Sequence, residues 1–398
     1  MKPAAILDIG SAKVVCLCGS AVHEDGILVH GVGTGIYPGF VDGVFTDEAA
    51  LKEAVISAIE QAEQQSRIRI RELAVSVPAP FAHLELTNAM IRTESRKYRL
   101  TQDDINDVIA ASCENAKRDG YVIMHSTPVS FTVNGITVTE EPVGERAAEL
   151  EVTESHMLVK TSFIRVIEDI LTPLDIEISM FLSADLANAT HIIPPEERVR
   201  PAVLIDIGAT LTSVCTVENN ALTGLQWFDM GGNQFAGDLA FGLDIPLEYA
   251  EQVKRRHTFL KDRLSNVEIV RMPTGVKKFP QEIIDLIVDA RAEELISLIK
   301  DALDKLDVRA DRRPVVYLTG GGLSPLHGSG EYLHRQLGIP VKRDIPSYLH
   351  EMNSPNYTSA FGALDFVFRA TMAVEQEDEP QQSSAGSLMD KLKNFFNQ

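Results

Sequence analysis

Apolar positions near the start of the chain group into short runs with strand-like spacing, followed by one stretch with helical spacing. The runs over residues 4–9, 14–19 and 27–32 are separated by turn residues, which predicts three strands. Residues 46–64 then repeat their apolar side chains every three or four positions, the pattern of an amphipathic helix. Another strand is expected over 73–78. This order of elements predicts an α/β domain built on a mixed sheet.

The stretch 84–162 interrupts this order and predicts a compact α/β insertion. Thr101, with Asp104 three residues later, has the spacing of a helix-capping box, so a helix is expected to begin there. Two strand-like runs follow, over 122–133 and 150–160.

The second half of the chain repeats the alternation of strands, turns and helices predicted for the first half. After a helical stretch, an apolar strand again runs into a glycine turn, and the remaining segments are mostly helical. The helices are expected over 161–174, 246–257, 280–306 and 359–371, with a buried strand within 314–324.

The same apolar run into Asp-Ile-Gly occurs twice, as AILDIGSAKV from Ala5 and as VLIDIGATLTSV from Val203. In both copies a turn with Ser or Thr follows the predicted strand. Backbone N–H groups and hydroxyls in such a turn can hold phosphate oxygens, and a strand-end Asp can hold Mg²⁺ through water. Two more glycine turns, DMGG from Asp229 and LTGGG from Leu318, strengthen the pattern. It predicts a duplicated domain that grips a nucleotide between two facing loops.

Composition narrows the class of protein. With a net charge of −20 and a pI of about 4.9, the chain has no basic run long enough for a nucleic-acid surface. No apolar stretch has the length of a membrane span and the first residues lack a secretory pattern, so a cytoplasmic protein is expected. Neither the four cysteines nor the ten histidines show metal-ligand spacing, and the cysteines are expected to fill the core in a reducing compartment.

In the order of these motifs the chain resembles the actin-like ATPase superfamily, and within it the FtsA family of bacterial cell-division proteins. The resemblance runs almost end to end. It is most specific in the position of the 84–162 insertion, with its Pro-Val-Gly at Pro142 and Leu-Glu-Val at Leu150. It implies an α/β, duplicated, actin-like (ribonuclease H-like) fold of two lobes with an FtsA-type 1C insertion.

The resemblance also implies a division of the chain into subdomains, a linker and a terminal helix. These are subdomain 1A over 1–83 and 163–200, subdomain 1C over 84–162, subdomain 2A over 201–245 and 313–373, subdomain 2B over 246–312, a disordered linker over 374–386, and an amphipathic helix over 387–398.

An ATP site with Mg²⁺ follows from the same resemblance. Asp8 and Asp206 would orient Mg²⁺ through water, and the catalytic residues stay unassigned. ATP turnover, if any, would be slow. The residues expected to face the nucleotide are Asp8, Gly10, Ser11, Lys13, Asp206, Gly208, Thr210, Gly231, Gly232, Asn233, Glu251, Lys254, Gly320, Gly321 and Gly322.

The second loop departs from the family pattern Asp-Ile-Gly-Gly-Gly-Thr-x-Asp. Ala209, Thr210 and Leu211 stand in place of Gly, Gly and Thr, and Ser213 stands in place of the final Asp. Fewer glycines stiffen the loop, and the lost carboxylate removes a group that could position water or metal. This loop is similar to that of PilM, the FtsA-like protein of type IV pilus machines, so a pilus-assembly adaptor is the alternative. A small-molecule kinase of the superfamily would need a catalytic Asp in a closed pocket, for which the sequence offers no candidate.

The last twelve residues, SLMDKLKNFFNQ, predict an amphipathic helix that Ser387 can cap. Apolar side chains gather on one face and lysines flank it, behind an acidic linker, which is typical of an interfacial membrane anchor. A helix packed on the protein's own core, or a frayed end, would be the other interpretations. The apolar face consists of Leu388, Leu392, Phe395 and Phe396, with Met389 at its edge.

Taken with the tail, the resemblance implies an ATP-binding protein that polymerises and tethers FtsZ filaments to the cytoplasmic membrane. Its expected partners are FtsZ through subdomain 2B, further copies of itself, an anionic membrane surface and later division proteins, with no nucleic acid. Its expected place is the cytoplasm, peripheral on the inner face of the membrane at the division site.

Overall fold

The computed structural model describes residues 3–22, 26–95, 97–260, 266–309, 313–343 and 357–377. Its strands are β1 Ala4–Ile9, β2 Lys13–Val22, β3 Gly26–Ile36, β4 Phe40–Val41, β5 Val44–Phe45, β6 Glu72–Val77, β7 Ala82–Arg92, β8 Tyr121–Val133, β9 Ile136–Val138, β10 Glu149–Lys160, β11 Glu177–Ser183, β12 Ala202–Ile207, β13 Thr212–Glu218, β14 Ala221–Phe228, β15 Val267–Met272, β16 Gly275–Pro280, β17 Val315–Thr319 and β18 Val341–Arg343. Its α-helices are α1 Glu48–Ser66, α2 Gln102–Asn115, α3 Thr161–Leu171, α4 Ala184–Ile192, α5 Gly232–Leu243, α6 Leu247–Arg256, α7 Gln281–Lys305, α8 Ser329–Leu337 and α9 Thr358–Glu377.

Two five-stranded sheets with the same strand order form the centre of the molecule. The first has the order β3-β2-β1-β6-β11 and the second β14-β13-β12-β17-β18. In each, three antiparallel strands continue into two parallel ones, and the strand carrying Asp-Ile-Gly lies in the middle. The predicted duplicated α/β fold of two lobes is therefore confirmed.

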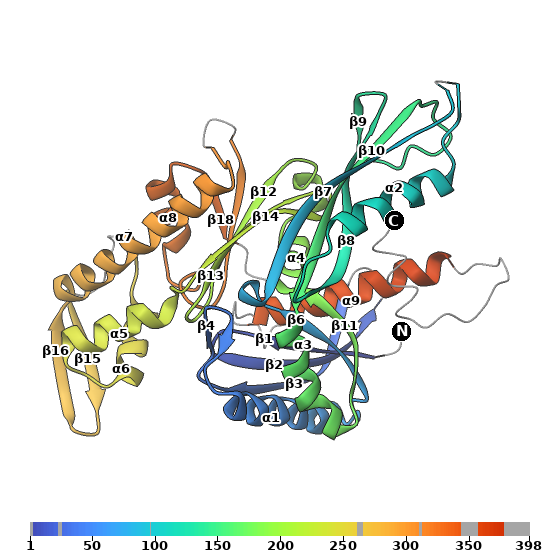
Figure 1. The fold of residues 1–398 in the computed structure, drawn as a ribbon. Helices are drawn as coiled ribbons and strands as arrows, with labels where there is room; N and C mark the ends of the chain where they lie inside the picture. Colours follow the sequence, from blue (N-terminus) through green and yellow to red (C-terminus); the bar gives the residue numbers. More distant parts are fainter. Residues whose placement is uncertain are drawn as a thin grey trace.

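Helices cover both sheets and also fill the space between them (Figure 1). On the first sheet, α1 and α3 bury the apolar face that includes Leu7 and Val75. The other face packs against α9 through Ile6, Leu17 and Leu364. On the second sheet, α5, α7 and α8 enclose the largest core, while α4 packs on the face toward the first lobe. Helices α4 and α9 contact each other and so join the two halves.

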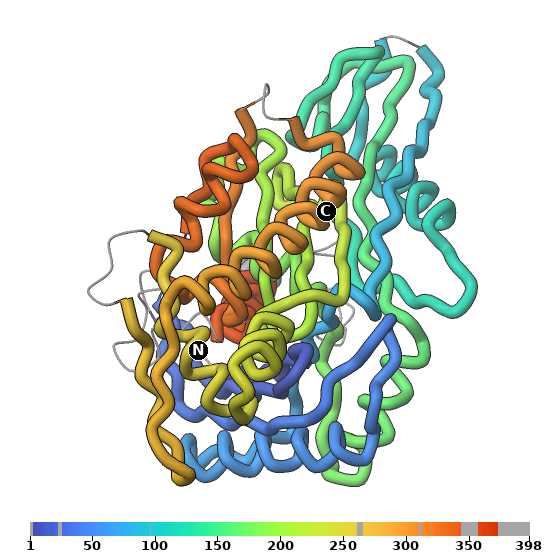
Figure 2. Tube along the Cα trace, turned by 90° about the vertical axis from the view of Figure 1, so that its left-hand side faces the viewer, coloured from blue at the N-terminus to red at the C-terminus, as the bar shows by residue number. Residues whose placement is uncertain are grey.

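The insertion is a four-stranded sheet, β7-β10-β8-β9, with α2 packed on one face. Figure 2 shows this segment, coloured cyan to green, extending away from both lobes. Its helix begins as predicted, because Asp104 N–H donates to Thr101 Oγ1 at 3.3 Å and Thr101 N–H donates to Asp104 Oδ2 at 2.7 Å. The bounds of the subdomains themselves stay a prediction.

The end of the chain differs from the expectation in one respect. Helix α9 continues to Glu377, whereas the disordered linker was expected to begin at 374. Glu and Gln are good helix formers, so acidic composition alone did not end the helix. The rest of the linker and the predicted membrane helix over 387–398 lie outside the described residues. Among the helices described here, none is both long and apolar enough to cross a membrane.

A stripe of three glycines on β3 brings α1 unusually close to the first sheet. Gly31, Gly33 and Gly35 alternate along the strand and so share one face. A Cβ on Gly33 would lie 1.7 Å from the carbonyl oxygen of Ala58. On Gly35 it would lie 2.0 Å from that of Ala54. The stripe therefore seats the helix backbone directly on the strand.

We expect Gly33→Ala to lower the free energy of unfolding by about 2–3 kcal/mol, because a helix carbonyl cannot rotate out of the way of the added methyl group. Gly237→Ala is the matched control, since no described atom lies within 4 Å of that Cβ position, on an exposed face of α5. It should be neutral or stabilise by about 0.5–1 kcal/mol. Urea unfolding of the two variants measures both, and equal stabilities would contradict the close contact between β3 and α1.

Candidate functional site

The two Asp-Ile-Gly turns adopt the same local geometry at the ends of β1 and β12. Gly10 N–H donates to the carbonyl of Lys13 at 2.9 Å, and Gly208 N–H donates to that of Leu211 at 2.8 Å. The loops also touch across the lobes, because Thr210 N–H donates to Ser11 Oγ at 3.2 Å and Thr210 Oγ1 to the carbonyl of Ser11 at 3.3 Å. The internal repeat seen in the sequence is therefore also a structural repeat, with its two copies facing each other.

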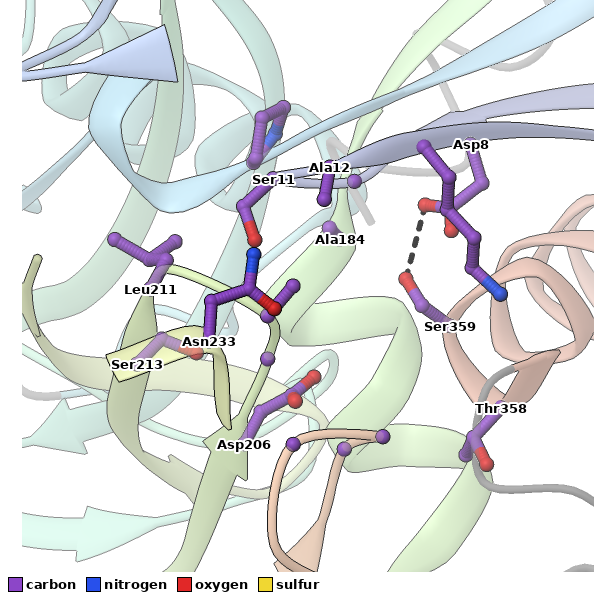
Figure 3. A pocket seen from close by; sticks show the side chains of 18 of the residues that line it. Asp8, Ser11, Ala12, Ala184, Asp206, Leu211, Ser213, Asn233, Thr358 and Ser359 are labelled. Atoms are coloured by element: carbon purple, nitrogen blue, oxygen red, sulfur yellow. Dashed lines mark hydrogen bonds between the residues drawn. The ribbon is translucent and has the colours of Figure 1, made fainter. Parts of the chain in front are cut away.

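Between the two lobes lies a cleft of about 400 Å³ into which both loops open (Figure 3). This volume lies in the range of pockets that hold small molecules and cofactors. The structure brings most of the predicted site residues to its wall. Those lining it are Asp8, Gly10, Ser11, Lys13, Asp206, Gly208, Asn233, Glu251, Lys254, Gly320, Gly321 and Gly322.

Three predicted residues, Thr210, Gly231 and Gly232, do not belong to the wall formed by the described residues. Thr210 turns toward the first loop. The two glycines allow close packing: a Cβ on Gly231 would lie 2.5 Å from the carbonyl oxygen of Gly208, and Gly232 N–H donates to that oxygen at 2.9 Å. Gly322 comes equally close, since its Cβ would lie 2.1 Å from the same atom. These glycines let three turns meet around the end of β12.

Three carboxyl groups, Asp8, Asp185 and Asp206, line the cleft together. Asp8 is only 8% exposed and accepts hydrogen bonds from Ser76 Oγ at 2.8 Å and Ser359 Oγ at 2.9 Å. Burial raises its pKa against the opposing effect of these bonds. Burial, with the charges of Asp185 and Asp8, raises the pKa of Asp206 to about 7. The cleft thus concentrates negative charge that a cation would relieve.

Asp185 was missed by the sequence analysis. It lies in the first turn of α4, which Ser183 caps by accepting from Leu186 N–H at 3.2 Å. Its side chain is nine-tenths buried, its Oδ2 has no hydrogen-bond partner among the described residues, and burial raises its pKa to about 6. The hydroxyl of Ser213 lies close enough to moderate that shift. Asp185 therefore brings a carboxylate to the position where Ser213 departs from the family pattern.

Basic groups line another part of the same wall. Lys254, on α6, is 3% exposed, donates to the carbonyl of Gly232 at 3.2 Å and pairs with Glu251 at 2.7 Å. Lys13 follows the first loop, and burial lowers its pKa. The hydroxyl groups of Thr319, Thr358 and Ser359 also line the cleft and were not predicted from the sequence. The hydroxyl oxygens of Thr319 and Thr358 are buried and lack hydrogen-bond partners within the described part of the chain.

These groups suit a ligand with phosphates and a divalent cation. Carboxylates and hydroxyls are oxygen ligands of the kind Mg²⁺ prefers, held directly or through water. Backbone N–H groups in glycine turns and nearby lysines suit phosphate oxygens. A polar ligand in the cleft would also satisfy the buried polar atoms of this wall that have no hydrogen-bond partner among the described residues.

Comparison of the sequence with known protein families gives matches to FtsA in both the second half of the chain and the insertion. The model described as "Cell division protein FtsA" matches residues 203–362, and the model of the SHS2 domain inserted in FtsA matches residues 82–158. The FtsA of Pseudomonas aeruginosa is 23% identical over 390 residues, 96% of this chain and 92% of the relative. That of Streptococcus pneumoniae serotype 2 is 24% identical over 404 residues, 98% of this chain and 87% of the relative.

Solved structures with the same fold extend the comparison. A PilM–PilN type IV pilus biogenesis complex aligns with a TM-score of 0.62 at 16% identity, covering 91% of this chain and 97% of that one. MreB5 of Spiroplasma citri, bound to AMPPNP, aligns with a TM-score of 0.58 at 12% identity, covering 96% and 99%.

The duplicated sheets and the cleft between two glycine loops define a protein of the actin-like class. The two matched models both describe parts of FtsA and together cover more than half of the sequence. The chain belongs to the FtsA family of cell-division proteins.

Proposed function

We propose that this chain binds ATP with Mg²⁺ in the cleft, polymerises, and tethers FtsZ filaments to the cytoplasmic membrane through its C-terminal helix. The observation that carries the proposal is the pair of matched loops facing each other beside the carboxyl groups of Asp8, Asp185 and Asp206. Membership of the FtsA family supports the role in division. The MreB5 structure with AMPPNP supports a nucleotide as the ligand of this fold.

In this proposal each part of the cleft has one task. Backbone N–H groups near Gly10 and Gly208 would receive phosphates, while Asp8 and Asp206 would orient Mg²⁺ through its water ligands. The ion would neutralise phosphate charge when bound. Asp185 would supply the carboxylate that the second loop lacks, which makes slow ATP hydrolysis compatible with this chain.

Nucleotide binding would also set the angle between the lobes. One loop belongs to each lobe, and the loops are joined directly by the hydrogen bonds of Ser11 and Thr210. A phosphate group held by both loops would compete with or rearrange those bonds. The nucleotide would thereby favour one relative position of the lobes, and a fixed position is what a repeating filament contact requires.

Subdomain 2B, predicted over 246–312, is the proposed contact with FtsZ. In that region α7 carries Leu286, which is 72% exposed, and α6 begins with Leu247, which is 58% exposed. Ile283, which is 43% exposed, precedes Leu286 by one turn of α7, so the two side chains lie side by side. Contiguous exposed apolar surface of this kind is typical of a protein contact. The insertion would be left free for contacts between copies or with later division proteins.

We expect FtsZ filaments to pellet with anionic liposomes only when this protein and Mg-ATP are present. Leu286→Glu should lower the FtsZ in the pellet about tenfold, because a charge replaces an apolar contact and one tenfold step costs about 1.4 kcal/mol. Val199→Glu is the control, since Val199 is 61% exposed outside subdomain 2B. If FtsZ stays in the supernatant with the unmodified chain, the partner assignment is wrong.

The second candidate is a pilus-assembly adaptor similar to PilM. The second loop, with Ala209, Thr210 and Leu211, favours it, and the PilM–PilN structure shows that the fold is shared. An adaptor of this kind would bind a short peptide and would have no affinity of its own for lipid. Liposome binding by the full chain would therefore separate the two candidates.

A further inference from the structure

A second group of polar side chains is buried inside the insertion, outside the lining of the cleft. Cys113 on α2, with Glu154 and His156 on β10, places a thiol, a carboxylate and an imidazole so that one ligand atom of each lies within 4.8 Å of the others. Glu154 and His156 are fully buried, and Cys113 is partly buried. The sequence spacing predicted no metal ligands among the cysteines and histidines, because these residues converge only in the folded insertion.

The sheet explains why they converge. Side chains two residues apart on a strand share a face, so Glu154 and His156 both point toward α2. Strand β10 changes register with β8 on either side of this pair, between Thr153 and Glu154 and between Met157 and Leu158. Such irregularities re-aim side chains and are common beside functional sites. Here they frame the segment that lies under the last turn of α2.

The environment also changes from apolar to polar at this point. Under the first turns of α2, the core consists of apolar side chains such as Ile105, Val108 and Val152. Under its last turn it consists of Ser112, Cys113, Glu154 and His156. Burying polar groups costs free energy unless they are paired. Ser112 and His156 are paired, since Ser112 Oγ lies 3.1 Å from Nε2 of His156 and Ser126 Oγ lies 2.7 Å from its Nδ1.

Glu154 has no such pairing. Neither of its carboxylate oxygens makes a hydrogen bond to any described residue, and Oε2 lies 3.6 Å from Nε2 of His156. Burial raises the pKa of Glu154 to about 7 and lowers that of His156 to about 4.

One nitrogen of the imidazole is held as it is in many metal-ligating histidines, because Nδ1 lies 2.7 Å from Ser126 Oγ, which fixes the ring. Nε2 faces Glu154 and lies 2.8 Å from Thr87 Oγ1 and 3.1 Å from Ser112 Oγ, so a metal ion at Nε2 would take the place of these hydroxyl contacts. A hydrogen bond to the nitrogen that does not bind the metal is the usual support for such a ligand. The 3.6 Å between Glu154 and His156 also fits, because ligand atoms in a tetrahedral zinc site lie about 3.3–3.8 Å apart.

We propose that Cys113, Glu154 and His156 bind one divalent transition-metal ion of the zinc class, with a hydroxyl oxygen or water as the fourth ligand. Sulfur, imidazole nitrogen and carboxylate oxygen are the donors that zinc takes in proteins. Binding places the missing positive charge beside Glu154 and releases the thiol proton of Cys113 to solvent. The partial exposure of Cys113 provides a route for the ion.

The ion would fasten the end of α2 to the sheet at the place where the insertion meets the second lobe. Ser155, between the two ligands on β10, donates through Oγ to the carbonyl of Leu222 at 2.6 Å. Asn219 Nδ2 donates to the carbonyl of Val129 at 3.1 Å, next to the irregular register of β8. Metal binding would stiffen the insertion directly above this joint.

The test uses the full-length chain, stripped of metal by a chelator and titrated with Co²⁺. We expect a thiolate-to-cobalt charge-transfer absorption that saturates at one equivalent and persists in excess Mg²⁺. Cys113→Ser should abolish the band, and Cys18→Ser, which alters another buried thiol on β2, should retain it. Zinc measured by mass spectrometry after dialysis should likewise reach one per chain only when Cys113 is present.

Glu154→Gln keeps the size of the side chain and separates metal binding from folding. Its Co²⁺ affinity should fall at least about tenfold, since the carboxylate ligand is lost, while its melting temperature without metal should not fall. Absence of the band in the folded, unmodified chain, or an equal band in Cys113→Ser, would overturn the proposal. Glu154 would then be a protonated carboxylic acid in the core.

Discussion

Replacing Asp8 by alanine is expected to abolish Mg-ATP binding, with a loss of affinity of at least about 100-fold, the equivalent of about 2.7 kcal/mol. The carboxylate is the group proposed to orient Mg²⁺ from the end of β1, and hydrogen bonds to charged groups are worth about 1.5–3 kcal/mol each. Titration of a fluorescent ATP analogue in the presence of Mg²⁺ measures the effect. Unchanged affinity would show that the site assignment is wrong.

Loss of binding must be separated from loss of folding. Asp8→Asn keeps the size of the side chain and leaves a partner for the hydroxyls of Ser76 and Ser359. Because burial raises the pKa of Asp8, ionising this carboxyl costs free energy in the empty cleft. The asparagine variant should therefore be at least as stable as the parent when nucleotide is absent, and still fail to bind it.

A matched control removes the same charge elsewhere. Asp169 is exposed on α3 and does not belong to the lining that the described residues form. Asp169→Asn should bind the nucleotide as tightly as the parent chain. If both variants lose affinity equally, the effect is one of net charge and not of the proposed magnesium position.

The repeated Asp-Ile-Gly motif made the cleft between the lobes predictable because both copies are local. Each is one strand and the turn after it, and local hydrogen bonding from Gly10 to Lys13 and from Gly208 to Leu211 fixes its shape. Once the two strands occupy the middle of equivalent sheets, their turns must lie at corresponding edges. Most of the predicted residues therefore reach one wall.

Residues that enter the site through tertiary packing could not be predicted in the same way. Asp185 lies at the start of a helix with an ordinary cap, and only the packing of α4 on the second sheet brings it beside Ser213. Gly33 and Gly35 were left outside the strand predicted over 27–32, because glycine weakens strands and marks turns. Their role in seating α1 depends on a helix that comes later in the chain.

The glycine residues near the cleft also show that tertiary packing limits what the sequence can predict. Gly231 and Gly232 were assigned to the nucleotide because backbone without a Cβ can approach a ligand. In the structure another backbone approaches them, since Gly231 packs on the carbonyl of Gly208, and their role toward a nucleotide stays a prediction. A glycine turn indicates that some other group approaches the backbone closely. Whether that group belongs to a ligand or to the protein itself depends on the fold.

Removing the last twelve residues is expected to abolish the binding of this protein to membranes. With anionic liposomes and Mg-ATP, the full chain should pellet and a chain ending at Gly386 should remain in the supernatant. The reason is the apolar face formed by Leu388, Leu392, Phe395 and Phe396. On a helix these positions fall on one side, and the neighbouring lysines at 391 and 393 favour an anionic surface.

One such helix binds only weakly. Each large apolar side chain contributes roughly 1.5–3 kcal/mol on burial, and the cost of association offsets part of the sum. Several helices held by one filament bind far more tightly, because each further contact becomes intramolecular. We therefore expect pelleting to require conditions in which the protein polymerises, and to fall at least about tenfold when Mg-ATP is omitted.

Two point variants test the face itself. Phe395→Glu places a charge in the apolar face and should prevent pelleting without lowering the melting temperature. Asn394→Glu makes the same change in charge one residue away, on the opposite face of the helix, and should retain binding. A large loss of stability in Phe395→Glu would instead indicate a tail packed against the protein's own core. If even the full chain fails to pellet, the pilus-adaptor function becomes the better account of this fold, because such an adaptor needs a peptide partner and no lipid.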